Sequence, residues 1–325
     1  MTTTRLDRIK MFLPIIGIFL LFYLIHRLGI ENIITALFSI NLVYIFISLL
    51  LTIPLLIVRI FGWQIILHEQ KIKLRFFPSM KIFVIGFFYG IITPAYAGQL
   101  MRIPYMREKT EEPYGKLFAS VITETGLRTL PLYAMMIAGA FFVASSIPNL
   151  LYVTIIWMVL ISGITFYFIK KTRGEKVFHL MLKYMIPKKL KRYFSSFADT
   201  FYTDYPRVKT FIGPLLLGFC TWIIVFTQYY LVVLSLGITT IPYFAFLLLF
   251  PIANVAGFIP ITFAGLGTRE FTAVFLFSTL FHVLEQDVFV FSLVGFLITD
   301  IFVGIIGLLL SFTEVRTRPL GFIEK

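Results

Sequence analysis

Two arginines that follow glycine-containing turns inside apolar stretches are the strongest candidates for chemistry in this sequence. Arg102 ends the segment Gly90–Arg102, and Arg269 ends the segment Gly257–Arg269. An arginine inside a membrane is costly to desolvate unless it meets an anion, and a guanidinium can hold phosphate through two parallel hydrogen bonds. We therefore expect both arginines to bind an anionic group. The alternative for Arg102 is an anchor in a basic cytoplasmic loop, and for Arg269 it is an ion pair with the adjacent Glu270.

The two segments share a pattern around their glycines. Aligned without a gap, they have in common a glycine, an isoleucine, an aromatic residue, an Ala-Gly pair and an arginine four residues later. Proline and glycine interrupt both, so neither is expected to continue as one unbroken helix. We predict two re-entrant hairpins that break at Pro94 and Pro260. The polar and glycine positions that would adjoin a substrate there are Gly98, Gln99, Gly265 and Gly267.

Four further ionisable residues lie within apolar runs. Glu124 and Arg128 are one helical turn apart, so they would either neutralise each other or line a polar path. Arg59 lies in the second apolar run, from which a long side chain can extend to the cytoplasmic surface. Asp300 is near the middle of the last run, where an unpaired carboxylate is costly. Arg59, Arg128 and Arg269 are its candidate partners, and the sequence does not choose among them.

Signatures of catalysis and of metal binding are absent from the sequence. His68 and Glu69 lack the second histidine of a zinc-protease motif, and the glycines near residue 265 do not follow a strand as in a nucleotide-binding fingerprint. There is also no acidic cluster suited to Mg²⁺ and no phosphate loop. We therefore predict no metal, no cofactor and no enzymatic activity.

Composition places these residues in a membrane. The chain of 325 residues is 59% hydrophobic and 14% charged, with a mean hydropathy of +0.92, which is typical of a helical bundle that faces lipid. The net charge of +13 does not indicate nucleic-acid binding, because the basic residues gather in short stretches between apolar runs, as the positive-inside rule requires. All but four of the 29 lysines and arginines lie in residues 5–10, 71–81, 102–116, 170–209 and 316–325.

The basic stretches predict the topology when all are placed in the cytoplasm. The result is an all-α polytopic membrane protein with six full transmembrane helices and two oppositely oriented re-entrant helical hairpins, and with both termini in the cytoplasm. The first hairpin would enter from the cytoplasmic side and the second from the outside. The connections left outside contain no lysine and only one arginine, Arg27. They are residues 26–41, 144–149, 236–242 and 282–285.

The order of elements suggests an internal repeat within one membrane domain, residues 1–325. Residues 11–143 and 150–312 each contain two spans, a hairpin and a further span, and the two halves start on opposite sides. Transporters use such inverted repeats, with the substrate site at broken helices. Between the spans, the cytoplasmic loop 170–209 interleaves basic and apolar residues. It would either lie as a helix on anionic membrane lipids or form a plain solvated loop.

At these residues the sequence resembles the transmembrane region of the lysylphosphatidylglycerol synthase/flippase family. The resemblance is carried by Pro94–Arg102, by residues 259–270 and by Arg59 with Trp63, and it covers essentially the whole chain. It is most specific at Gly265–Glu270, which reads Gly-Leu-Gly-Thr-Arg-Glu. The resemblance implies the translocation of lipids between leaflets, and the absence of an aminoacyl-transferase domain means that synthesis of lysyl-lipid is not implied.

Several positions depart from the pattern of that family. Gln99 stands where an acidic residue often follows the glycine of the first hairpin, and Phe263 and Ala264 replace the usual proline and glycine. In the following helix, Thr125 and Arg128 stand where an arginine and an aspartate are expected. The charge at position 128 is therefore reversed, so the substrate preference of the family does not carry over directly.

These observations together predict a flippase-like transporter in the cell membrane. Its substrate would be an anionic lipid, either a phospholipid or a polyprenyl-phosphate-linked sugar, whose phosphate Arg102 and Arg269 bind alternately. One alternative is a membrane-embedded transferase that uses a lipid-linked donor, with Glu124, Glu270 or Asp300 as its acid or base. Another is a membrane partner that recruits a cytosolic glycosyltransferase through the 170–209 loop. The sequence also leaves a homo-oligomer open.

Overall fold

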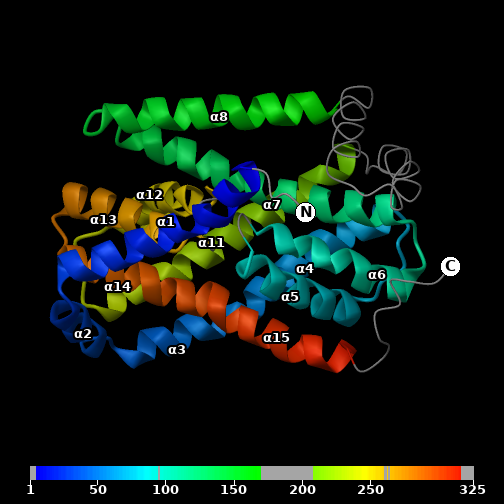
Figure 1. Ribbon diagram of the computed structural model, residues 1–325, viewed down its shortest axis with the longest axis horizontal. Helices are drawn as coiled ribbons and strands as arrows, with labels where there is room; N and C mark the ends of the chain where they lie inside the picture. The colour runs from blue at the N-terminus through cyan, green and yellow to red at the C-terminus, as the bar shows by residue number, and fades with distance from the viewer. Residues whose placement is uncertain (1–4, 94–95, 170–207, 260–261, 263, 316–325) are drawn as a thin grey trace.

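The computed structural model describes residues 5–93, 96–169, 208–259, 262 and 264–315, and the regular structure of these residues is entirely helical. This confirms the predicted all-α class (Figure 1). Pro94, Pro260 and nearly all of the basic loop 170–209 lie outside the described residues. The elements are α1 (Arg5–Leu28), α2 (Ile30–Phe38), α3 (Leu42–Leu50), α4 (Thr52–Glu69), α5 (Phe76–Ile91), η1 (Ala97–Met101), α6 (Arg102–Thr110), α7 (Tyr114–Phe142), α8 (Pro148–Ile169), η2 (Val208–Phe211), α11 (Ile212–Ser235), α12 (Tyr243–Ala256), α13 (Thr268–Phe281), α14 (Glu285–Phe296), η3 (Leu297–Ile301) and α15 (Phe302–Val315).

Several helical stretches are long and apolar enough to cross a membrane. Leu42–Glu69, Lys209–Ser235 and Glu285–Thr313 each contain 27 to 29 residues. At a rise of about 1.5 Å per residue, each exceeds the roughly 30 Å of a hydrocarbon core. A fourth candidate is the pair Gly17–Leu28 and Ile30–Phe38, which is bent by 85°. The chain is therefore built as a multi-pass membrane protein, and the exact number of six spans stays a prediction.

The described elements on either side of both predicted breaks pack against each other. In the first hairpin, residues 76–110, η1 packs against α5 and α6 packs against α5 and α7. The hydroxyl of Thr93 accepts a hydrogen bond of 2.7 Å from the amide of Gly98 and so closes the turn. In the second hairpin, residues 243–281, α12 packs against α13. The two hairpins lie at opposite ends of the bundle (Figure 1), and their re-entry into a bilayer stays a prediction.

Each hairpin packs against the last span of the other half of the chain. Gly139 of α7 lies against the carbonyl of Leu248 in α12, and Gly307 of α15 lies against the carbonyl of Val84 in α5. A Cβ atom added to these glycines would lie 1.9 Å and 2.3 Å from the respective carbonyl oxygens. Small residues let helices approach closely in a membrane, where packing rather than burial from water drives association. This crossed arrangement is the one expected of two equivalent halves, although the inverted repeat itself stays a prediction.

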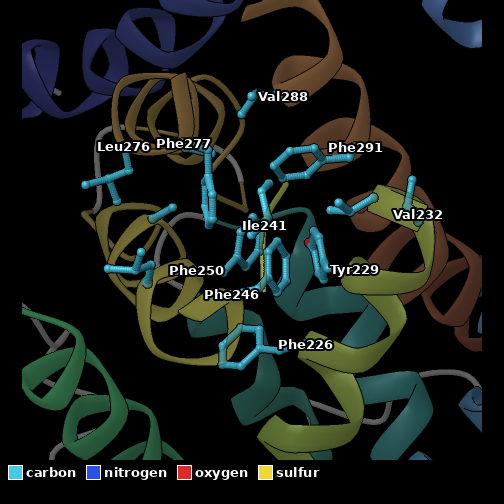
Figure 2. Close-up of a cluster of buried hydrophobic side chains, with 14 of the residues drawn as sticks. Phe226, Tyr229, Val232, Ile241, Phe246, Phe250, Leu276, Phe277, Val288 and Phe291 are labelled. Carbon is cyan, nitrogen blue, oxygen red and sulfur yellow. The ribbon is translucent and has the colours of Figure 1, made fainter. Parts of the chain in front are cut away.

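Aromatic side chains hold the second hairpin in the bundle. Phe246 and Phe250 of α12 stack with ring centroids 5.0 Å apart, and both meet Phe277 of α13 and Phe291 of α14 (Figure 2). Tyr229 of α11 packs against Phe250 at 4.5 Å. Offset and edge-on aromatic pairs stabilise a core beyond the area that they bury. These aromatic contacts in the core therefore hold the second hairpin against α11 and α14.

The two ends of the bundle differ in charge. One end carries the basic connection 70–75, α6 and the described end of α15, and we call it the basic end (Figure 1). At the opposite end, Arg27 forms an ion pair of 2.9 Å with Glu285, and the amide of Asn41 donates to the carbonyl of Ser235 at 2.9 Å. These contacts join connections that the sequence places together on the outer side. Which end faces the cytoplasm stays a prediction.

Candidate functional site

Arg102 is held inside the bundle by the turn of the first hairpin. It is the first residue of α6, directly after η1, and its side chain is fully buried. Gly86 of α5 makes room for it, because a Cβ there would lie 2.3 Å from Cγ of Arg102. An arginine anchored in a solvated loop would be exposed. The alternative of a surface anchor is therefore wrong, because the close contact between α5 and the turn directs this side chain inward.

The Arg102 guanidinium is paired on several sides. Its Nη1 donates to Oε2 of Glu124 at 2.8 Å, and its Nη2 donates to Oε1 of Gln99 at 2.8 Å. The guanidinium also lies over the rings of Trp63 and Phe83, with centroids at 5.1 Å and 4.7 Å. A buried arginine is tolerated when charge, hydrogen bonds and aromatic faces all compensate for lost hydration. Arg102 thus meets an acidic partner within the protein.

Glu124 bridges two arginines rather than one. Its Oε1 accepts from Nε of Arg128 at 2.8 Å, which confirms the pairing expected from their spacing on one helix. Arg128 also donates to Oε1 of Gln99 at 3.3 Å, so Gln99 and Glu124 together connect the first hairpin to α7. Two arginines share one carboxylate, which leaves this group with a net positive charge. The structure brings Gln99, Arg102, Glu124 and Arg128 together, whereas the sequence predicted only the pair of Glu124 with Arg128.

Arg59 lies beside this group and is unpaired at two nitrogen atoms. Only 6% of the residue is exposed, and Nε and Nη1 have no hydrogen-bond partner among the described residues. Its guanidinium lies over the ring of Phe87 at 5.4 Å. The expected extension to the cytoplasmic surface is therefore wrong, because α4 continues ten residues beyond Arg59 before it ends. A buried donor without an acceptor costs about 1–3 kcal/mol, and more when it is charged.

A cleft between α4, α7 and α11 brings Arg59, Glu124 and Arg128 to one surface. About 10 Å³ of it is open to the centre of a water-sized sphere. The indole of Trp222 holds the α7 side of this region by donating to the carbonyl of Arg128 at 2.7 Å. Apart from Thr221, the remaining wall is apolar or glycine. The cleft is lined by Val58, Arg59, Gly62, Ile66, Glu124, Arg128, Pro214, Leu217, Gly218 and Thr221. We call Arg59, Arg102, Glu124 and Arg128 the basic cluster.

Arg269 and Glu270 form a second buried group at the start of α13. Arg269 is 3% exposed and Glu270 is fully buried. Nε of Arg269 donates to Oε1 of Glu270 at 3.0 Å, and Nη2 makes a second contact with the same oxygen. The other carboxylate oxygen accepts from the amide of Gly267 at 2.7 Å, and Arg269 lies over the ring of Phe296 at 4.3 Å. The structure therefore shows the ion pair that was the alternative for Arg269, and binding of a substrate anion stays a prediction.

The glycines of the two hairpins are needed by the backbone itself. A Cβ at Gly98 would lie 2.0 Å from the carbonyl oxygen of Tyr89. Gly265 and Gly267 have φ angles of +80° and +89°, in the region that L side chains rarely adopt. Gly267 also lies against the carbonyl of Gly17 in α1. Chain packing explains all three glycines, and their contact with a substrate stays a prediction.

Asp300 pairs with hydroxyl groups instead of an arginine. Its Oδ1 accepts from the hydroxyl of Tyr96 at 2.9 Å, and its Oδ2 accepts from Thr299 at 2.7 Å. No salt bridge within 4.0 Å joins Asp300 to a basic residue in the part of the chain that the structure describes. The expected arginine partner is thus wrong, because the turn of the first hairpin places Tyr96 in that position. Sequence reasoning missed Tyr96, and its place inside the broken segment is the only signal for it.

The described residues contain no group of three or more side chains suited to holding a metal ion. Asp300 lies in η3, a π-helical turn that interrupts the last long helix, and such turns occur frequently at functional sites. The candidate site is therefore made of two charged groups, the basic cluster and the pair Arg269–Glu270. A hydrogen bond from the hydroxyl of Tyr96 to Asp300 joins the first hairpin to the last long helix.

Comparison with known proteins agrees with this architecture. Residues 12–307 match the model of a family described as "Lysylphosphatidylglycerol synthase TM region". The chain is also 25% identical over 153 residues to the UPF0104 membrane protein MJ1595 of Methanocaldococcus jannaschii. That second match covers 46% of this chain and 46% of the archaeal protein. Because the family model spans most of the sequence, the chain belongs to the family of the lysylphosphatidylglycerol synthase transmembrane region.

Proposed function

We propose that this protein is a flippase-like transporter that moves an anionic lipid between the leaflets of the cell membrane. The basic cluster carries the proposal. Arg59, Arg102 and Arg128 contribute three positive charges, and Glu124 contributes one negative charge, all within the bundle. Uncompensated charge at this depth is costly, and intramembrane ionisable residues mark the paths of substrates. A lipid phosphate would supply the missing negative charge.

The surroundings of the cluster favour a substrate with apolar tails. Phe61 of α4 is 52% exposed and Leu216 of α11 is 59% exposed, so the helices that frame the cleft turn apolar side chains outward. In a membrane these faces meet lipid chains rather than water. A lipid could therefore place its phosphate between the helices while its tails stay in the hydrocarbon.

The hairpins offer a way to pass the phosphate across the bundle. Glu124 is shared by Arg102 and Arg128, so a phosphate that pairs with Arg102 leaves Glu124 still neutralised by Arg128. Glu270 would keep the hydrogen bond from the amide of Gly267 when Arg269 engages another anion, but it would lose its cationic partner among the described residues. Exchange of a carboxylate for a phosphate is therefore easier at Arg102 than at Arg269. Alternate binding by the two arginines stays a prediction.

A transport assay with two lipids tests the proposal. The purified chain is reconstituted into liposomes that contain fluorescently labelled phosphatidylglycerol or labelled phosphatidylcholine, and an impermeant reductant reports the label that reaches the outer leaflet. We expect faster movement of phosphatidylglycerol than in protein-free liposomes, and a smaller effect on phosphatidylcholine. Equal rates with and without protein for the anionic lipid, and for a polyprenyl-phosphate-linked sugar in the same assay, would reject the proposal.

The transferase alternative has one observation in its favour, because Glu124 lines the cleft and an acid or base must face a pocket. Both oxygens of this carboxylate, however, already accept from arginines, so the atoms that would take a proton from a substrate are engaged. Formation of a product from a lipid-linked donor by the purified chain would replace transport by this alternative.

A further inference from the structure

We infer that the cleft between α4, α7 and α11 is a binding vestibule for the phosphate of an anionic lipid, with Arg59 and Arg128 as its cationic ligands. The inference rests on the proposed function and adds two ligands to its site. In this scheme Arg59 and Arg128 bind the phosphate first, before the hairpin arginines. Arg102 and Arg269 would act later, once their carboxylate partners are exchanged.

The state of Arg59 is the main observation. Its side chain is more than nine-tenths buried and lines the cleft, while Nε and Nη1 have no acceptor. Arg102 and Arg269, by contrast, each pair directly with a carboxylate. Buried charges are normally paired, and a guanidinium without a protein acceptor is matched geometrically to phosphate oxygens. Among the described arginines of the basic cluster, Arg59 is thus the one with donors free for an anion.

The opposite wall of the cleft adds a second positive charge. The side chain of Arg128 is 11% exposed and that of Glu124 is 4% exposed, so the arginine is the more accessible of the pair. Glu124 already accepts from two arginines, which reduces its repulsion of an incoming anion. A phosphate placed between Arg59 and Arg128 would therefore be held from two helices, α4 and α7.

The cleft is narrow in this structure. Only about 10 Å³ of it is open to the centre of a water-sized sphere, which is room for about one water molecule. Gly218 of α11 keeps the passage close-packed, because a Cβ there would lie 3.0 Å from Pro131 of α7. Binding of a phosphate would therefore require the helices that line the cleft to move apart.

The lining of the cleft extends toward the basic end of the bundle. Ile66 of α4 and Pro214 of α11 line it near the ends of their helices, and Arg59 lies seven residues before Ile66. At a rise of about 1.5 Å per residue, the two positions are roughly 10 Å apart along α4. A phosphate would therefore enter from the leaflet beside the basic connection 70–75, and its tails would stay along the apolar flanks of α4 and α11.

The test measures lipid retained by the purified full-length chain. Wild type, Arg59→Gln and Arg27→Gln are extracted in detergent, supplied with equal phosphatidylglycerol and phosphatidylcholine, and examined by native mass spectrometry. Arg27→Gln is a matched control, because it removes the same charge from an exposed ion pair at the opposite end. We expect Arg59→Gln to retain about tenfold less phosphatidylglycerol, a factor that corresponds to about 1.4 kcal/mol. The control should retain as much as wild type.

A stability measurement separates a ligand role from a structural one. Because Arg59 lacks acceptors at two nitrogens, the lipid-free Arg59→Gln protein should be at least as thermally stable as lipid-free wild type. If Arg59→Gln fails to fold, Arg59→Lys and Arg59→Met replace it, with retention expected in the lysine variant and lost in the methionine variant. Equal phosphatidylglycerol retention by wild type and the charge-removing variant would overturn the inference.

Two further arms distinguish the source of the phosphate and the fate of the proposed function. Displacement of phosphatidylglycerol by inorganic phosphate at equal concentration would assign the cleft to a free anion and overturn the lipid assignment. If Arg59→Gln loses phosphatidylglycerol but wild type transports no lipid, the proposed function is rejected and the binding role of the cleft is supported. If wild type transports lipid but Arg59→Gln retains phosphatidylglycerol normally, the proposed function is supported and the binding role of the cleft is rejected.

Discussion

The hydroxyl of Tyr96 donates a hydrogen bond of 2.9 Å to Oδ1 of Asp300, which lies 204 residues later in the chain. The same tyrosine packs edge-on against Phe258, just beyond α12, with centroids 6.0 Å apart. One side chain at the turn of the first hairpin thus touches the last long helix and the second hairpin. Any movement of one hairpin relative to the other must break or carry along this contact.

Loss of the Tyr96 hydroxyl is expected to destabilise the protein. Tyr96→Phe keeps the ring contacts but removes one of the two hydroxyls that donate to Asp300. An acceptor that loses its partner inside the bundle costs about 1–3 kcal/mol, so the midpoint of thermal unfolding in detergent should fall. Tyr152→Phe is the control, since Tyr152 is 65% exposed on α8. Equal midpoints for the two variants would contradict a stabilising role of the hydrogen bond.

Glu124 should matter more for stability than either of its partners. Arg102→Gln leaves the carboxylate paired with Arg128, whereas Glu124→Gln leaves both arginines without an acidic partner. Removing one member of a buried pair typically costs about 3–5 kcal/mol. We expect Glu124→Gln to lower the unfolding midpoint further than Arg102→Gln does.

A surface pair provides the comparison for that experiment. Glu112, in the connection before α7, and Lys116 of α7 form an ion pair of 2.9 Å with both side chains partly exposed. Exposed pairs typically contribute about 0.2–1 kcal/mol. Lys116→Gln should therefore shift the midpoint only slightly. If Arg102→Gln lowers the unfolding midpoint more than Glu124→Gln does, Glu124 is not the carboxylate that both arginines share.

The close packing of each hairpin against the opposite half predicts a pair of intolerant glycines. Gly139→Ala and Gly307→Ala would each place a Cβ about 2 Å from a backbone carbonyl oxygen, so the helices must move apart. We expect both variants to unfold at lower temperature and to lose transport. Gly126→Ala on α7 is a matched control, because nothing lies within 4 Å of its added Cβ. That variant should be neutral or more stable by up to about 1 kcal/mol.

Cysteine labelling tests the sidedness of the two ends. In a Cys220→Ser background, Arg27→Cys is expected to react with an impermeant maleimide on intact cells, because Arg27 is exposed at the end without basic connections. Lys73→Cys, in the basic connection 70–75, should react only after the cells are permeabilised. The opposite pattern would place the basic end outside and reverse the predicted topology.

The sequence predicted the elements better than their contacts. The broken segments were found because proline, glycine and the charges on either side are local signals, and the Glu124–Arg128 pair follows from helical spacing alone. The Arg102–Glu124 pair and the Tyr96–Asp300 contact join residues on different elements, and packing between helices decides them. The spacing of residues along one helix does not specify which other helix will pack against it.

Arg59 shows where sequence reasoning fails most clearly. A lone arginine in an apolar run is normally interpreted as a residue that reaches the membrane surface, because its long side chain can extend to polar headgroups. Here the neighbouring helices α7 and α11 cover that path and turn the guanidinium toward a cleft. The exposure of a long side chain depends on what packs beside its helix, and the sequence gives no direct sign of that.

The most direct measurement of the central claim is the rate of phosphatidylglycerol movement in proteoliposomes for wild type, Arg102→Gln, Arg269→Gln and Arg27→Gln. The two hairpin arginines are buried and paired with carboxylates, while Arg27 lies in an exposed pair. If phosphate passes between the hairpin arginines, each hairpin variant should lose most of the protein-dependent rate, about tenfold or more for one charge-assisted contact of about 1.4–3 kcal/mol. Arg27→Gln should keep the wild-type rate. Wild-type rates in both Arg102→Gln and Arg269→Gln would contradict the account.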